Sequence, residues 1–273
     1  MASRAQSQGD QGASAGRGIR LICLDLDGTA ADHAGPHTWL ADHVVDVLND
    51  VGRRGVRWCV NSGRSFQNQA GMVQACRRLA NMPVAYLSGE RFIHWTGERS
   101  VAHEPFNTLM RTRLEQMYPQ VTTALAPHLE RLRATYQFNF EQDTDLIVGW
   151  NLNTRPHTET FIAELRTLLA AVPDAQILQN ATWVIITHRE AGKGVVLAEA
   201  ARHLGIAREQ ILAIGDHLND LDMLDGRAAA HVGCPADADP EVQAVVRAAG
   251  GMIAAAEHTH GTVEIIRRMM NAE

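Results

Sequence analysis

The sequence lacks several features that would each indicate a particular class of protein. No apolar run approaches the roughly 20 residues that a membrane-spanning helix needs, so no membrane partner is expected. The net charge of −6 argues against a surface that binds nucleic acid. Its four cysteines form no CxxC pair, and Cys23 and Cys59 fall in predicted buried strands. Scattered, buried thiols favour a reduced, cytoplasmic setting.

Lysine is also nearly absent, because the chain holds 24 arginines and one lysine, Lys193. An ammonium is a compact point charge, whereas a guanidinium is a planar fork. A chain that otherwise uses arginine keeps an ammonium at this one position. Lys193 is therefore a candidate functional residue, with chance placement on the surface as the alternative.

The remaining composition is that of a globular protein. With 273 residues, 45% of them hydrophobic, the chain is long enough for one or two domains with a large core. The first 18 residues are mostly Ala, Gly, Ser, Gln and Arg, without the apolar stretch of a signal peptide. They are predicted to form a disordered tail over residues 1–18.

Strand and helix patterns alternate in the first and last thirds of the chain. Strands are predicted at 20–26, 56–61, 83–87, 210–215, 228–232 and 251–254. Helices are predicted at 38–52, 65–80 and 193–204 and from residue 261, with a hairpin after Ser88-Gly89. This alternation predicts an α/β fold with a doubly wound parallel sheet, a Rossmann-like core.

The middle of the chain breaks this rhythm. Residues 103–133 have a helical pattern that Pro119 and Pro127 are expected to interrupt. Strands at 135–141 and 145–152, a helix at 157–171 and strands at 175–179 and 182–188 follow. The pattern predicts a smaller α+β cap, residues 91–187, inserted into a core of residues 19–90 and 188–273. A lid over the sheet edge would shield a reaction there from water.

Residues 20–29 are the most informative segment. An apolar strand stops at two carboxylates, Asp25 and Asp27, and Gly28 and Thr29 then turn the chain. In an open α/β sheet, ligands bind outside the carboxyl ends of the strands. Two close carboxylates repel each other and are costly to desolvate, so this position favours a bound cation.

Three further polar clusters follow predicted strands or open helices. Ser62-Gly63-Arg64 follows the second strand, where a hydroxyl and backbone N–H groups can hold a phosphate, although a helix-capping serine is equally possible. Lys193 opens a helix. Asp216, Asn219 and Asp220 follow another apolar strand and could ligate a hard cation, although they could also only cap a turn.

Two other groups favour structural roles. His258 and His260 are predicted to lie in a surface loop rather than a metal site, because no strand-end carboxylate accompanies them. Trp58 is predicted in the core, and Trp150 and Trp183 in the packing of the cap sheet. Stacking of a sugar on one of these tryptophans is the alternative.

The four clusters together resemble the signature of the haloacid dehalogenase-like hydrolases. The matching segments are Asp25-Leu26-Asp27-Gly28-Thr29, Ser62-Gly63-Arg64, Lys193-Gly194 and Gly215-Asp216-His217-Leu218-Asn219-Asp220. The form of the last segment and the position of the insert are similar to the Cof-like and sucrose-phosphatase-like branch. The segment Ala30-Ala31-Asp32 departs from the apolar pair usual in that branch.

The resemblance implies a mechanism and a Mg²⁺ cofactor. Asp25 is expected to attack phosphorus and form an aspartyl-phosphate, and Asp27 to act as general acid and base. Mg²⁺ would bind Asp25, the backbone carbonyl of Asp27, and Asp216. The phosphoryl oxygens would be held by Ser62, Gly63, Lys193 and Asn219. Asp220 is expected to orient Lys193 or a metal-bound water.

Three functions follow from these expectations. The first is a Mg²⁺-dependent phosphatase on a small phosphorylated metabolite, with a sugar phosphate as the expected substrate. The second is a phosphotransferase or phosphomutase that uses the same aspartyl-phosphate but excludes water. The third is a catalytically silent binding protein, against which the intact set of charged residues argues. The sequence leaves the choice between the first two open, together with the substrate and the oligomeric state.

Overall fold

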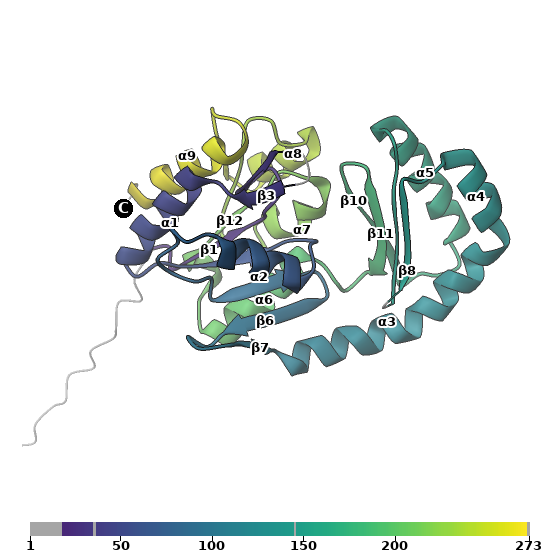
Figure 1. The fold of residues 1–273 in the computed structure, drawn as a ribbon, viewed down its shortest axis with the longest axis horizontal. Coiled ribbons are helices and arrows are strands. Elements are labelled where there is room, and N and C mark those ends of the chain that lie inside the picture. Colours follow the sequence, from purple (N-terminus) through teal and green to yellow (C-terminus); the bar gives the residue numbers. More distant parts are fainter. Residues whose placement is uncertain (1–17, 35–36, 145, 272–273) are drawn as a thin grey trace, which may run out of the picture.

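The computed structural model describes residues 18–34, 37–144 and 146–271. It contains two parts, each built from its own sheet and helices (Figure 1). The tail expected at residues 1–18 lies almost entirely outside the described residues. The larger sheet has eight strands in the order β14-β13-β12-β1-β4-β5-β6-β7. The six strands from β14 to β5 run parallel, whereas β6 and β7 are antiparallel.

The strands of this sheet are short and strongly apolar. β1 is fully buried because a parallel sheet is covered on both faces. The strand bounds are β1 (Leu21–Leu24), β4 (Arg57–Asn61), β5 (Ala85–Ser88), β6 (Arg91–Trp95), β7 (Ser100–Ala102), β12 (Ile211–Ile214), β13 (His231–Cys234) and β14 (Met252–Ile253).

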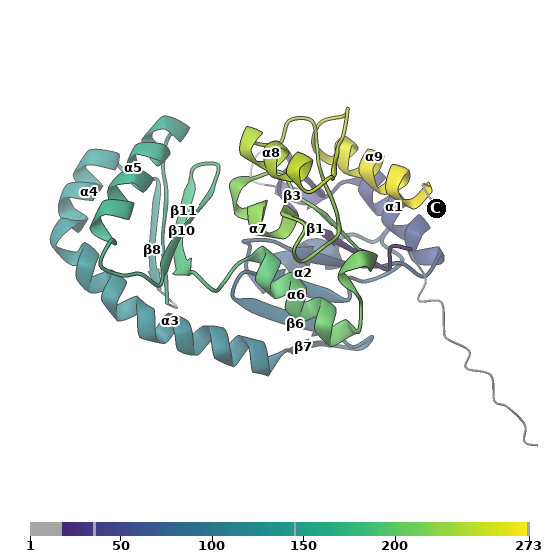
Figure 2. The ribbon, with the colours of Figure 1, turned by 180° about the vertical axis from the view of Figure 1, so that it is seen from behind.

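Helices cover both faces of the larger sheet (Figures 1 and 2). On one face lie α1 (Asp42–Arg53), α2 (Phe66–Ala75) and α9 (His258–Asn271). On the other lie α6 (Lys193–Leu204), α7 (Leu221–Leu224) and α8 (Pro240–Ala248). The single-turn segments η2 (Arg208–Gln210) and η3 (Leu218–Asp220) flank β12. Two buried clusters on opposite faces make this a doubly wound α/β core, as the sequence predicts.

The smaller sheet has four antiparallel strands in the order β10-β11-β9-β8. Its strands are β8 (Phe140–Thr144), β9 (Ile147–Asn151), β10 (Ala175–Asn180) and β11 (Trp183–His188). One face packs on α3 (Glu104–Leu125), η1 (Ala126–His128), α4 (Leu129–Tyr136) and α5 (Arg155–Leu168). Figures 1 and 2 show these helices on the outer side, so the other face of the sheet turns toward the core.

The boundary between the core and the cap differs from the one expected. β6 and β7 pair in the larger sheet, whereas the 91–187 boundary assigned residues 91–102 to the cap. The reason is the hairpin after Ser88-Gly89, whose pairing with β5 carries both strands along the sheet edge. We therefore propose a cap that begins near residue 103, where α3 leaves the core.

Other local expectations also need correction. The predicted helix at 38–52 begins only at Asp42, because His37–Leu40 is strand β3, which pairs with β2 (Ala31–Ala34) in a hairpin. Pro119 does not interrupt α3, since it lies on the exposed side, where the carbonyl that loses its partner can face water. Pro127 does coincide with a break, because α3 ends at Leu125.

Candidate active site

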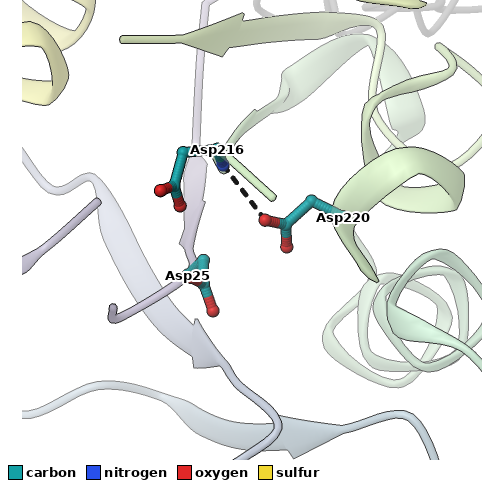
Figure 3. Close-up of side chains that lie close together, drawn as sticks. All are labelled: Asp25, Asp216 and Asp220. Atoms are coloured by element: carbon teal, nitrogen blue, oxygen red, sulfur yellow. Dashed lines mark hydrogen bonds between the residues drawn. The ribbon is translucent and has the colours of Figure 1, made fainter. Parts of the chain in front are cut away.

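The carboxyl edge of the larger sheet brings together the residues singled out in the sequence. Asp25 follows β1, Ser62 follows β4, Asp216 follows β12, and Lys193 is the first residue of α6. Figure 3 shows the side chains of Asp25, Asp216 and Asp220 close together, with Asp220 reaching the main-chain N–H of Asp216. Carboxylate oxygens of these three buried residues lie within 4.8 Å of one another.

Lys193 is the centre of this cluster. Its Nζ atom donates to Asp25 Oδ1 at 2.6 Å and to Asp220 Oδ1 at 2.6 Å. Burial disfavours the ammonium, but Asp220 and Asp25 raise the pKa of Lys193 above its usual range. Burial raises the pKa of Asp25 to about 8, with Lys193 opposing the rise and Asp220 and Asp216 adding to it. A further positive charge beside Asp25 would favour its ionised form.

Asp220 uses both of its oxygens within the protein. Oδ1 accepts from Lys193, and Oδ2 accepts from the N–H groups of Asp216 at 3.0 Å and His217 at 3.1 Å. A Cβ atom at Gly215 would lie 2.6 Å from Asp220 Oδ2, so this tight turn needs glycine. The geometry favours the role of orienting Lys193 over that of a metal ligand.

Asp216 is held by two residues to which the sequence reasoning gave no role. Thr29 Oγ1 donates to Asp216 Oδ1 at 2.9 Å, and His217 Nδ1 lies 2.7 Å from Asp216 Oδ2. Burial lowers the pKa of His217, but the Asp216 carboxylate raises it further, to about 9. Thr29 could have been found in the sequence, because it belongs to the first motif.

The Asp27 side chain is paired with Arg64 and His33 rather than with the carboxylate cluster. Arg64 holds it in a bidentate pair, with Nε 2.8 Å from Oδ2 and Nη2 2.6 Å from Oδ1. His33 Nε2 lies 3.1 Å from Oδ1. Burial raises the pKa of Asp27, but the Arg64 contacts outweigh it and lower the value overall. Arg64 stood in the second motif without a role, and no local signal pointed to His33.

The expected phosphate-binding residues lie at the same edge of the larger sheet or line a cavity there. Ser62 is buried, and its Oγ accepts from the Arg64 N–H at 3.3 Å. Gly63, Lys193 and Asn219 line a cavity, and Asn219 Oδ1 has no partner among the described residues. Gln69 was missed by the sequence reasoning, although its Nε2 donates to the carbonyl of Ser62 and so fixes this loop.

This cavity lies between the core and the free face of the small sheet and has a volume of about 1150 Å³. Trp183 lines it and is 43% exposed, so the prediction that it packs the cap sheet is wrong, whereas Trp150 is buried there. His258 also lines the cavity, as the first residue of α9. The surface loop predicted for His258 and His260 is therefore wrong, because both belong to that helix.

The fold and site define an α/β enzyme with a carboxylate-rich active site beneath an inserted cap. A family model described as haloacid dehalogenase-like hydrolase matches residues 128–261. The 5-amino-6-(5-phospho-D-ribitylamino)uracil phosphatase YitU of Bacillus subtilis is 24% identical over 233 residues, 75% of this chain and 83% of the relative. A phosphoglycolate phosphatase of Methanothermobacter thermautotrophicus is 31% identical over 97 residues, 36% of this chain and 41% of the relative.

Solved structures share the whole architecture. The sucrose-phosphatase from Synechocystis sp. PCC6803, solved in complex with sucrose and phosphate, has a TM-score of 0.67. The match covers 92% of this chain and 98% of that structure at 17% identity, which shows a common fold. The family match over residues 128–261 is to the haloacid dehalogenase-like hydrolases, and the solved structures show that the chain shares their fold over nearly its whole length. The enzyme class of this chain is phosphoric monoester hydrolase.

In the part of the chain that the structure describes, no helix combines the length and apolar character needed to cross a membrane.

Proposed function

We propose that this protein is a Mg²⁺-dependent phosphatase that hydrolyses a small phosphorylated metabolite, with a sugar phosphate as the expected substrate, through an aspartyl-phosphate on Asp25. The observation that carries the proposal is the state of the Asp25 carboxylate. Lys193 fixes Oδ1, while Oδ2 is buried without a partner among the described residues. An oriented carboxylate with one free oxygen is suited to nucleophilic attack. The phosphatase names of the two sequence relatives support the reaction class.

The reaction proceeds in two steps on this chain's residues. Asp25 Oδ2 attacks phosphorus, the bond to the leaving oxygen breaks, and Asp27 gives that oxygen a proton, which Asp27 must first take up because Arg64 lowers its pKa. A water then attacks the phosphorus of the aspartyl-phosphate, Asp27 accepts the proton, and the Asp25 carboxylate is released with inorganic phosphate. Arg64 positions Asp27 for both transfers, because a bidentate pair fixes the plane of the carboxyl group.

The donor set fits Mg²⁺, which prefers oxygen ligands. Asp25 would bind the ion through the oxygen that does not attack phosphorus, Asp216 lies beside it, and the Asp27 main-chain carbonyl is the expected third ligand. Thr29 and His217 hold Asp216, and Asp220 positions Lys193 rather than the ion. When bound, Mg²⁺ supplies positive charge that keeps Asp25 ionised and offsets repulsion from the phosphate.

Four groups are the expected partners of the phosphoryl oxygens: the Ser62 hydroxyl, the Gly63 N–H, the Lys193 ammonium and the Asn219 side chain. Gly63, Lys193 and Asn219 line the cavity, and Ser62 follows β4 at the same sheet edge as Asp25. Preorganised donors of this kind stabilise charge as it moves onto the transferred group. Lys193 contributes most, because it is the only cation bonded directly to Asp25 among the described residues.

The proposal is tested first by metal removal. Chelation with EDTA should abolish phosphate release from a panel of phosphorylated metabolites, and Mg²⁺ should restore it. Measuring the release of inorganic phosphate in the presence of an added alcohol acceptor separates a phosphatase from a phosphotransferase. A phosphotransferase would move the phosphoryl group to the acceptor instead. Full activity in excess chelator would contradict the assignment of Asp25 and Asp216 as ligands.

A second test uses Gly28, whose φ is +79°. A Cβ atom there would lie 2.1 Å from Asp216 Oδ2, so Gly28→Ala should displace the carboxylate and raise the Mg²⁺ concentration for half-maximal activity at least ~10-fold. Gly55→Ala is the matched control, with φ +82° and open space around the added atom. Both variants should lose about 1–2 kcal/mol of stability from the left-handed backbone. An equal Mg²⁺ response in the two variants would contradict the role of Asp216.

A further inference from the structure

The free face of the cap sheet carries exposed apolar side chains where it faces the polar active site. Phe140 and Trp183 are 47% and 43% exposed, and their ring centroids lie 5.6 Å apart. Both line the cavity, together with Ile185. Along β11, Val184 and Ile186 face the cap helices, so the alternation of the strand directs Trp183 and Ile185 toward the cavity.

The acidic and basic side chains that line the cavity differ in number and in how they are paired. Besides Asp27 and Asp216, carboxylates come from Asp32, Glu90, Asp237 and Asp239. Each basic side chain in the described lining already has a carboxylate partner. The pairs are His33 and Arg64 with Asp27, Lys193 with Asp25 and Asp220, His217 with Asp216, and His258 with Asp237. Outside the phosphoryl position, the cavity therefore offers no uncommitted cation to an anionic group.

Among these carboxylates, Asp239 has one oxygen that is paired and one that is not. The side chain is 7% exposed, and its Oδ1 accepts from Arg155 Nη2 of the cap at 2.6 Å. Its Oδ2 is buried and has no partner among the described residues, although Asp239 lines the cavity. A buried, unpaired carboxylate oxygen accepts a hydroxyl or amino donor and repels an anion.

Resting on the proposed function, we propose that the leaving group of the substrate is an uncharged ring that carries hydroxyl or amino groups. The ring lies against Phe140 and Trp183, and a donor on it reaches Asp239 Oδ2. A leaving group with a carboxylate or a second phosphate would face unpaired negative charge, and an open chain would forgo the aromatic contact. A sugar and a heteroaromatic ring share this chemistry, and the experiment separates them.

The test compares substrates that differ in one property. Glycerol 3-phosphate and 3-phosphoglycerate differ by a carboxylate, and glucose 6-phosphate and sorbitol 6-phosphate differ by ring closure. We expect kcat/KM for 3-phosphoglycerate to be at least ~10-fold below that for glycerol 3-phosphate. Sorbitol 6-phosphate should fall at least ~5-fold below glucose 6-phosphate. The comparison of kcat/KM for riboflavin 5′-phosphate with kcat/KM for glucose 6-phosphate decides between a heteroaromatic ring and a sugar.

Two variants connect these preferences to named residues. Trp183→Ala should reduce the preference for glucose 6-phosphate over sorbitol 6-phosphate to about twofold or less, mainly through KM. Trp39→Ala is the matched control, since Trp39 is 42% exposed and does not line the cavity. Asp239→Asn should reduce the ratio of kcat/KM for glycerol 3-phosphate to kcat/KM for 3-phosphoglycerate about threefold or more. Preferences unchanged in Trp183→Ala, or 3-phosphoglycerate used as well as glycerol 3-phosphate, would overturn the inference.

Binding to the Asp25→Asn variant tests the inference without turnover. Isothermal titration should give a lower Kd for glucose 6-phosphate than for sorbitol 6-phosphate, and Trp183→Ala in the same background should remove the difference. If that order holds but the wild-type protein releases no phosphate with Mg²⁺, the proposed function fails and the inference on ligand class stands. If phosphate is released but the order is absent, the inference fails and the proposed function stands.

Discussion

Asp25→Asn should abolish phosphate release while leaving the fold intact. The amide has the shape of the carboxylate but cannot attack phosphorus, so the covalent step is lost. We expect turnover to fall by at least about 10⁴-fold, as when the nucleophile of a catalytic set is removed. Steady-state phosphate release measures the effect, and mass spectrometry of quenched wild-type enzyme should find a phosphoryl group on the peptide that contains Asp25.

The stability of this variant separates a chemical effect from unfolding. Burial of an ionised Asp25 is costly, as the rise of its pKa to about 8 indicates, so a neutral amide should change the free energy of unfolding by no more than ~2 kcal/mol. Asp50→Asn, at an exposed position on α1, controls for the substitution itself. Turnover of Asp25→Asn within tenfold of the wild-type value would exclude the covalent mechanism.

Changes at Lys193 should have the second-largest effect. The ammonium is buried between Asp25 and Asp220, with 2.6 Å to each, and can follow charge as it shifts to and from the phosphoryl group. Lys193→Arg keeps the charge but places a wider, planar donor in a packed site. We expect turnover at least ~10²-fold lower in Lys193→Arg and lower still in Lys193→Ala.

Stability measurements should distinguish the two lysine variants. Lys193→Ala leaves two buried carboxylates without their cation, which should cost about 3–5 kcal/mol, and thermal unfolding would detect this. Lys193→Arg retains the charge and should remain folded, so its activity is the informative measurement. Wild-type turnover in Lys193→Arg would show that a positive charge suffices and that the shape of the donor is unimportant.

The sequence by itself determined the architecture of the core and the position of the candidate site residues. β1, β4 and β12 are short apolar runs that end at polar residues, and this local pattern predicts both the strand and its end. Because parallel strands present their carboxyl ends at one edge, Asp25, Ser62 and Asp216 had to be neighbours. Lys193 was found as the one lysine of the chain, at a helix start.

Contacts between distant segments were decided by the tertiary structure. The Asp25–Lys193 pair spans 168 residues and the Arg155–Asp239 pair spans 84, and no local pattern encodes either distance. The turn of Asp27 toward Arg64 depends on how β1 and β4 lie side by side. A short segment fixes its own backbone through periodicity and turn residues, but it does not specify which side chains will face it.

The cap shows most clearly which features the sequence determines and which the tertiary structure decides. Its α+β character follows from the sequence pattern, whereas the pairing of β6 and β7 with the larger sheet and the exposure of Trp183 do not. An aromatic residue in a strand predicts burial, because hydrophobic burial is the usual source of stability. Trp183 faces a cavity instead, since the core and the free face of the cap sheet meet there without filling the space between them. Sequence periodicity determines which residues share a face, and only the docking of the cap on the core decides what that face meets.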